Sequence, residues 1–179
     1  MRASMLFKFS ACCLFAGAAA AMWAQGQQKP GLYEMTSRMS WQQSPMPAGM
    51  TLPPGMPNPF APRPNTAQIC LTQAQIDRYG TAVPQNQGRG QQNCTMTNIQ
   101  KNSTSMTATM VCTGQMQGTA QVHGSWDGTT SHSQVHFTGT MTGGPSGGSM
   151  PVEWTIDSTQ TYKGPDCGSV KPLPMPETR

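Results

Sequence analysis

The sequence has few charged residues and little net charge. Asp, Glu, Lys and Arg together make up 10% of the 179 residues, and the formal net charge is +4. An average soluble domain is about 25% charged. The chain therefore lacks the basic surface with which proteins bind nucleic acids through their phosphates. It also lacks the high charge of an extended disordered protein.

Common motifs for nucleotide binding, zinc binding and hydrolysis are absent as well. Neither a GxxxxGK[ST] loop nor a GxGxxG unit occurs, and no CxxC pair is present, so phosphate-binding loops and the usual zinc-ligand spacing are excluded. Glu153 and Asp157 share one face of a predicted strand. They lie about 13 Å apart, too far for the paired carboxylates of a glycosidase. We expect no catalytic residue and no enzymatic activity.

Long apolar runs are missing beyond the first 24 residues. Arg2 and Lys8 precede an apolar stretch from Phe9 to Ala21, and small residues lead to a cleavage point at Ala24. This is the pattern of a secretory signal peptide, and the apolar stretch is shorter than the roughly 20 residues that cross a bilayer. We predict a signal peptide over residues 1–24, no membrane span, and a mature protein that is periplasmic or secreted.

Four cysteines follow the predicted signal peptide: Cys70, Cys94, Cys112 and Cys167. An even number of cysteines in an exported protein predicts two disulfides, although four cysteines allow three pairings. If Cys94 lies opposite Cys112 in a hairpin, Asn98 faces Ala108, the methionines between them also face each other, and threonines take the other face. This agreement favours a Cys94–Cys112 bond. The other two cysteines then pair by elimination.

Alternating and interrupted patterns predict the elements of the first half. Residues 33–41 alternate between apolar and polar side chains, which indicates a half-buried strand. Residues 42–65 are rich in Pro and Met and predict a long loop. A short strand over 66–71 follows, and Thr72 to Gly80 reads as a brief helix with a capping residue at each end.

From residue 92 onward, Thr, Ser, Met and Gly dominate and turn sequences recur at steady spacing. This is typical of an antiparallel sheet. Asp127-Gly128 is the strongest hairpin signal. Taken as a two-residue loop, it places Trp126 on the core face and His123 directly opposite His132 on the outer face.

Together these patterns predict a mainly β fold: an antiparallel meander or partial barrel of about six to eight strands with one short helix. We expect a single disulfide-linked domain over residues 25–168 and a disordered tail over residues 169–179. Ile, Leu, Val and Phe are scarce, whereas 12 of the 15 methionines lie beyond residue 24. Methionine is therefore predicted to fill the core, and two disulfides offset the thinness of that core.

Several short motifs occur in a fixed order. They are PGLYEM at 30–35, MPAGMTLPPGM at 46–56, ICLT at 69–72, the Cys94 to Cys112 hairpin, and GPDC ending at Cys167. Together with the signal peptide, this set resembles the bacterial exported family known as domain of unknown function 3617, over nearly the whole mature chain. That family usually has Trp where this chain has Tyr33. The resemblance implies export by a Gram-negative bacterium and a small cysteine-linked β domain. It implies no activity, so no catalytic residue can be carried over.

Copper binding is one hypothesis for the function. The loop holds three methionines, Met46, Met50 and Met56, whose thioethers suit Cu(I). The facing pair His123 and His132 would chelate a second type of metal, because the Cβ atoms of opposed residues lie about 5 Å apart. The competing interpretation is that methionine is abundant throughout and that the two histidines form a solvated surface ladder.

A non-enzymatic binding or interaction domain without a cofactor is the preferred hypothesis. The interior of a partial barrel lined by methionines would hold a small apolar ligand. Alternatively, the 42–65 loop would dock on an envelope protein through its apolar residues Leu52 and Phe60.

Overall fold

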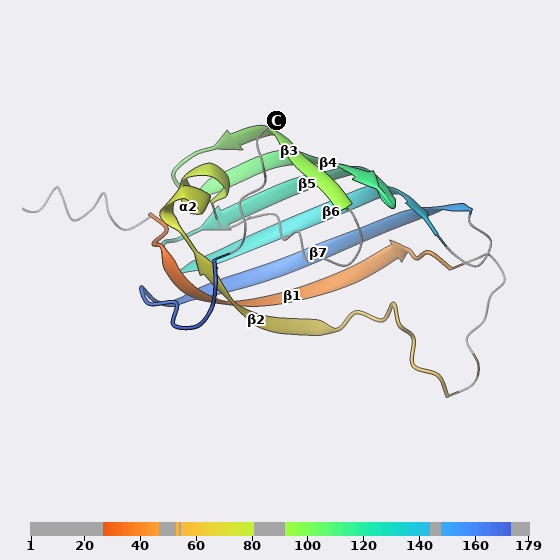
Figure 1. The fold of residues 1–179 in the computed structure, drawn as a ribbon, viewed down its shortest axis with the longest axis horizontal. Helices are drawn as coiled ribbons and strands as arrows, with labels where there is room; N and C mark the ends of the chain where they lie inside the picture. The colour runs from red at the N-terminus through yellow and green to blue at the C-terminus, as the bar shows by residue number, and fades with distance from the viewer. Residues whose placement is uncertain (1–26, 47–52, 54, 81–91, 144–147, 173–179) are drawn as a thin grey trace, which may run out of the picture.

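The computed structural model describes residues 27–46, 53, 55–80, 92–143 and 148–172 (Figure 1). The predicted signal peptide lies outside these residues, as do parts of the 42–65 loop and of the predicted tail. The described part of the chain contains seven strands and one helix: β1 (Gly31–Gln43), β2 (Pro64–Leu71), α2 (Gln73–Tyr79), β3 (Gln92–Lys101), β4 (Ser105–Gly114), β5 (Met116–Trp126), β6 (Thr130–Thr142) and β7 (Ser149–Gly164).

All seven strands form one antiparallel sheet in the order β2-β1-β7-β6-β5-β4-β3. Strands β3 to β7 form a meander, in which each strand pairs with the next along the chain. The first strand, β1, pairs with the last, β7, and β2 forms the edge beside β1. The predicted mainly β fold, with six to eight strands and one short helix, is confirmed.

The sheet is curved, and α2 lies across its concave side (Figure 1). In a flat sheet of seven strands the two edges would lie about 29 Å apart, whereas a seven-residue helix is only about 10 Å long. Nevertheless α2 reaches both edges. Ile76 shares an apolar cluster with Leu71 of β2, and Lys101 of β3 donates a hydrogen bond to the carbonyl oxygen of Ile76. The sheet is therefore an open partial barrel, and α2 covers one end of its hollow side.

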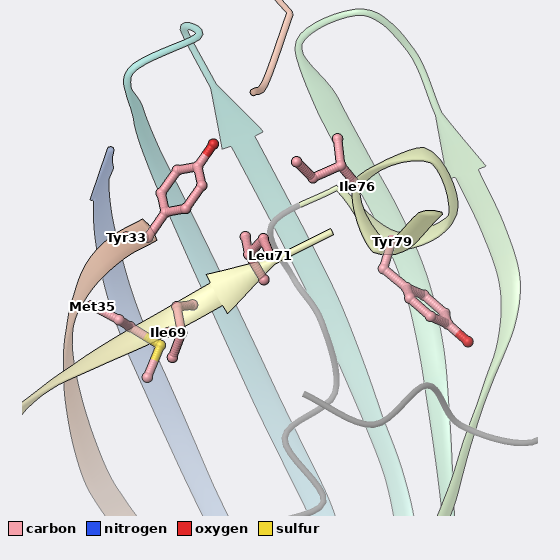
Figure 2. Packing of buried hydrophobic residues seen from close by; sticks show 6 residues of the cluster. All are labelled: Tyr33, Met35, Ile69, Leu71, Ile76 and Tyr79. Carbon is pink, nitrogen blue, oxygen red and sulfur yellow. The ribbon is translucent and has the colours of Figure 1, made fainter. Parts of the chain in front are cut away.

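We call the face that carries α2 the inner face and the opposite one the outer face. The cluster around α2 consists of Tyr33, Met35, Ile69, Leu71, Ile76 and Tyr79 (Figure 2). Two further clusters continue along the inner face, one around Phe137 and Trp154, the other around Met106 and Trp126. Methionines contribute to all three clusters, as predicted from the composition.

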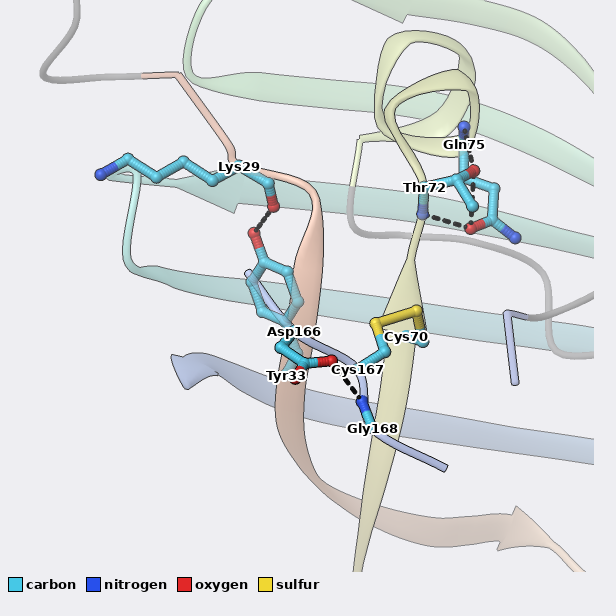
Figure 3. Close-up of a disulfide and its surroundings, with 8 residues drawn as sticks. All are labelled: Lys29, Tyr33, Cys70, Thr72, Gln75, Asp166, Cys167 and Gly168. Carbon is cyan, nitrogen blue, oxygen red and sulfur yellow. Dashed lines mark hydrogen bonds between the residues drawn. A yellow bond between two sulfur atoms is a disulfide. The ribbon is translucent and has the colours of Figure 1, made fainter. Parts of the chain in front are cut away.

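The sequence around α2 specifies a short helix with defined ends. The side chain of Thr72 accepts a hydrogen bond from the backbone N–H of Gln75, and the Gln75 side chain accepts one from the backbone N–H of Thr72 (Figure 3). This capping box begins the helix, and Gly80, with a φ of 59°, ends it. The predicted helix is confirmed. Within the described residues, no helix is long and apolar enough to cross a membrane.

Both predicted disulfides are present. Cys94–Cys112 joins β3 to β4, and Cys70–Cys167 joins the end of β2 to the segment that follows β7 (Figure 3). A turn closed by the Asp166 side chain, which accepts a hydrogen bond from a backbone N–H, shapes the chain beside Cys167. The second disulfide links the edge strand β2 to the segment that follows β7.

The first hairpin departs from its predicted register in its second half. Cys94 and Cys112 are direct partners, and the pairing expected from them holds for the residues that follow. A bulge then begins at Asn98, whose φ is +52°. The predicted pairing of Asn98 with Ala108 is therefore wrong, because an extra residue enters β3 at this point.

Candidate functional site

Three aromatic residues on adjacent strands lie side by side on the inner face. Phe137 of β6 is the partner of Trp154 of β7, which is also the partner of Trp41 of β1. The rings of Phe137 and Trp154 stack, with centroids 5.0 Å apart and 11° between their planes. We call these three residues the aromatic row. Phe137 and Trp154 are buried, whereas Trp41 is only half-buried.

Two glycines make room for the ring of Phe137. Gly118 of β5 and Gly139 of β6 are direct partners on the inner face. A Cβ atom added to Gly118 would lie 2.8 Å from Phe137 Cζ, and one added to Gly139 would lie 2.7 Å from it. Such contacts are too short for a real side chain. The glycines therefore let the ring approach the backbone of both strands.

Half-buried methionines surround the aromatic row. They come from β1, β4, β5 and β6: Met39, Met110, Met116 and Met141. We call these four residues the methionine rim. Ile156, the partner of Met39 on β7, is half-buried too. The rim packs against the buried cluster, and each of its four side chains keeps part of its surface accessible.

The 42–65 loop reaches the aromatic row through Phe60. Its ring meets that of Trp41 edge to face, with centroids 5.6 Å apart and 80° between the planes. Phe60, predicted as an anchor for a partner protein, is thus engaged within its own chain. Leu52, the other predicted anchor, lies outside the described residues.

The three loop methionines predicted to hold copper are only partly described. Met46 is half-buried and Met56 is 56% exposed, whereas Met50 lies outside the described residues. Copper binding by this set of thioethers stays a prediction.

The predicted cross-strand histidine pair is wrong in its register. His123 and His132 both lie on the outer face, as expected, but His123 is the partner of Gln134 and His132 is the partner of Ser125. The two imidazoles are diagonal neighbours and not direct partners. The predicted chelation of a metal by two directly opposed histidines is therefore ruled out.

The turn between β5 and β6 explains this difference. The side chain of Asp127 accepts hydrogen bonds from the backbone N–H groups of Thr129 and Thr130, and the backbone N–H of Asp127 donates to the carbonyl oxygen of Thr130. Asp127 is thus the first residue of the turn. The centre of the turn lies one residue nearer the C-terminus than predicted. The register shifts by two residues, which keeps each side chain on its predicted face but moves His123 past His132.

The outer face is polar, and its ion pairs are exposed. His136 Nε2 lies 3.4 Å from Glu153 Oε1, and Lys163 Nζ lies 2.9 Å from Glu34 Oε1. Such surface pairs contribute little to stability. Across the part of the chain that the structure describes, no three His, Cys, Asp or Glu side chains gather as they would around a metal ion.

The outer face also carries a groove that the sequence analysis missed. It has a volume of about 530 Å³ and includes both His123 and His132. Arg38 of β1 lines it as well. Strand alternation could have placed Arg38 on the outer face, opposite in parity to Met39. No pattern in the sequence indicates that β1 lies beside β7, which is what brings Arg38 into the groove.

Two groups near α2 have shifted pKa values. Burial raises the pKa of the Tyr33 phenol, whose hydroxyl donates a 2.7 Å hydrogen bond to the carbonyl oxygen of Lys29. Burial lowers the pKa of Lys101, whose ammonium group donates to the carbonyl oxygens of Ile76 and Asp77. These three hydrogen bonds hold chain segments in place around α2, which gives both groups a structural explanation.

Comparison with known proteins adds one finding. Residues 28–167 match the family described as "Protein of unknown function (DUF3617)". No curated protein and no solved structure matches the chain significantly. The family match spans all seven strands, α2 and both disulfides. The resemblance seen in the sequence is thereby confirmed, and the chain belongs to the DUF3617 family.

Proposed function

We propose that this chain is an exported, non-enzymatic binding domain that takes a small apolar ligand on the inner face of its sheet. The observation that supports this most strongly is the methionine rim, which leaves apolar surface accessible around the aromatic row. Ligand sites are typically concave and mostly apolar. The curvature that α2 stabilises gives the inner face this form.

The free energy for binding would come from covering this surface. Burial of apolar surface contributes roughly 25 cal/mol per Å². Isolated exposed apolar residues are ordinary on protein surfaces, whereas a contiguous apolar patch marks an interaction site. Met39, Trp41 and Met141 are half-buried and pack on the same buried cluster, so a ligand on this face would cover the parts of them that remain accessible.

The two parts of the proposed site have different mechanical properties. The floor is rigid, because Phe137 is stacked on Trp154 and held against Gly118 and Gly139. The rim consists of unbranched thioether side chains, which adapt to ligands of different shapes. This combination suits a class of apolar molecules of similar size better than one ligand with a fixed pattern of polar groups.

The proposed location is the periplasm or the extracellular space, after removal of residues 1–24. Two disulfides are compatible with such an oxidising compartment. In that aqueous space a binding domain with an apolar concave face would shield a poorly soluble molecule from water.

The test is a fluorescence titration of the mature, disulfide-bonded protein with the neutral apolar probe N-phenylnaphthylamine. We expect saturable binding, and we expect Met141→Gln to weaken it by about ten-fold, equivalent to about 1.4 kcal/mol. Met56→Gln is the matched control, because Met56 is exposed and belongs to none of the three inner-face clusters.

Each variant is also unfolded with urea, so that loss of binding is separated from loss of folding. Absence of saturable binding, or equal effects of Met141→Gln and Met56→Gln, would refute the proposed site. Binding of an extended apolar peptide but not of the small probe would replace the small ligand with a partner protein.

A further inference from the structure

The groove on the outer face crosses four adjacent strands, β1, β7, β6 and β5. Its volume of about 530 Å³ falls within the range of small-molecule sites, roughly 300 to 1,000 Å³. Gly124, Ser133 and Ser158 are partners on three of these strands and line the groove. All three positions have the parity of the inner face, so it is their backbone that forms the groove floor.

A row of four outward-facing partners forms one wall. It runs across the sheet from Arg38 through Asp157 and Gln134 to His123. The two middle residues are hydrogen-bonded to each other: Gln134 Nε2 donates a 2.8 Å hydrogen bond to Asp157 Oδ1. The side chains of Arg38 and His123, at the two ends, have no hydrogen bond or ion pair within the described part of the chain.

A second row of partners forms the other wall. It runs from Thr36 through Thr159 and His132 to Ser125. The hydroxyl of Thr159 lies 3.2 Å from His132 Nδ1. When that hydroxyl donates, the neutral imidazole carries its proton on Nε2 and can donate to a ligand. The Thr36 hydroxyl lies 3.1 Å from that of Thr66. Among the described residues the Ser125 hydroxyl has no hydrogen-bond partner.

We propose that this groove binds an elongated polar anion, with a carboxylate or phosphate group held by Arg38. The guanidinium presents a rigid fork of donors that matches both kinds of group. Among the described residues it forms no ion pair with Asp157, its partner across β1 and β7, and Asp157 Oδ1 accepts a hydrogen bond from Gln134. The remaining open groups of the groove include donors from His132 and Ser125, which suit oxygen acceptors along the body of the ligand.

The spacing of the open groups sets the length of the ligand. Arg38 and His123 lie on strands three spacings apart, which corresponds to about 14 Å between their backbones. Asp157 and Gln134 lie between them in the row, so a ligand that contacts both side chains and crosses these two residues is longer than a single phosphate or acetate ion. The free oxygen of Asp157 accepts hydrogen bonds, so a body that carries hydroxyl groups fits better than one with negative charge throughout. A disaccharide-sized acidic sugar has this chemistry.

This groove is on the opposite face from the proposed apolar site, so the two proposals can be tested separately. The probes are lactobionate, a disaccharide-sized sugar acid with one carboxylate, and trehalose 6-phosphate, a disaccharide with one phosphate. Acetate and inorganic phosphate are the short probes. Binding is measured by calorimetry on the mature protein at constant ionic strength. The longer probe that binds with the higher affinity identifies the anionic group that Arg38 prefers.

We expect a longer probe to bind in the millimolar range or better, and Arg38→Gln to weaken it by at least about ten-fold, as loss of a charge-assisted contact does. His123→Gln weakens the longer probe and leaves the short probes unchanged. Arg63→Gln is the control, since Arg63 is an exposed arginine that does not line the groove. Failure of both longer probes to bind, or equal losses in Arg38→Gln and Arg63→Gln, would overturn the proposal. Equal binding of short and longer probes would also contradict it.

Discussion

Trp41 and Trp154 are direct partners across β1 and β7, and they differ in what surrounds them. Trp154 is 5% exposed and stacks on Phe137, whereas Trp41 is half-buried and, among the aromatic rings described, has a T-shaped contact with Phe60. One tryptophan therefore belongs to the core of the sheet. The other forms part of the accessible apolar surface to which we assign binding.

Substitution of Trp154 separates packing from hydrogen bonding. Trp154→Ala should lower the free energy of unfolding by about 3–5 kcal/mol, as removal of a large buried side chain does. Its buried Nε1 has no hydrogen-bond partner in the described structure, so Trp154→Phe loses no hydrogen bond and should cost much less. Urea unfolding of both variants measures the difference. Equal losses in the two variants would contradict this account of the aromatic row.

Gly139 should tolerate no side chain. A Cβ atom there would meet the carbonyl oxygen of Gln117 and the ring of Phe137. We expect Gly139→Ala to cost about 1–3 kcal/mol, as overpacking does. Gly164→Ala is the matched control, because a Cβ atom at Gly164 would meet nothing within 4 Å. Thermal unfolding of both variants is the measurement, and an equal effect at the two positions would argue against close packing of Phe137.

The two disulfides should differ in their contribution to stability. The Cys70–Cys167 bond spans 97 residues and the Cys94–Cys112 bond spans 18. Loop-closure entropy predicts losses of about 4–5 and about 3 kcal/mol on their removal. Replacing each pair by serine and measuring unfolding in guanidinium tests this order. A larger loss for the shorter loop would show that packing around the sulfurs outweighs the entropy of the unfolded chain.

Asp127 should make the stability of the second hairpin dependent on pH. Hydrogen bonds from the backbone N–H groups of Thr130 and Thr129 hold the pKa of the Asp127 carboxyl below its ordinary value. Its contribution is therefore fully present above the unfolded pKa of about 3.9 and is lost as the pH falls through the lower folded pKa. Asp127→Ala should lower the Tm at neutral pH, with a difference from the parent that shrinks in acid.

Asn102 supplies the control for that experiment. Its side chain accepts from the backbone N–H groups of Thr104 and Ser105 in the first hairpin, in the same way that Asp127 does in the second. Asp127→Asn should therefore keep the turn without the titration. A Tm difference between Asp127→Ala and the parent that stays constant from neutral to acid pH would refute the role of the carboxylate.

These turns also show how far the sequence could be interpreted. The faces of β5 and β6 were predicted correctly because alternation has a period of two, and a register error of two residues leaves it intact. The partners were wrong because the role of Asp127 in its turn depends on which N–H groups its carboxylate accepts. A dipeptide motif does not contain that information.

The order of the strands in the sheet could not be predicted from the sequence either. Local turns predict that β3 to β7 pair in sequence, but the pairing of β1 with β7 joins segments more than a hundred residues apart. No local pattern specifies such a contact. For this reason the apolar parity of Trp41 and Trp154 could be predicted, whereas the aromatic row, and the groove that contains Arg38, could not.

The most direct test of the proposed function is a methyl NMR titration of the mature protein labelled with 13C at its methionine methyl groups. If the inner face binds an apolar ligand, N-phenylnaphthylamine will shift the signals of the methionine rim, Met39, Met110, Met116 and Met141, in a saturable way and leave exposed Met56 unchanged. Shifts confined to Met56, or no saturable shift at any rim methionine, would contradict the assignment of a binding site to this face.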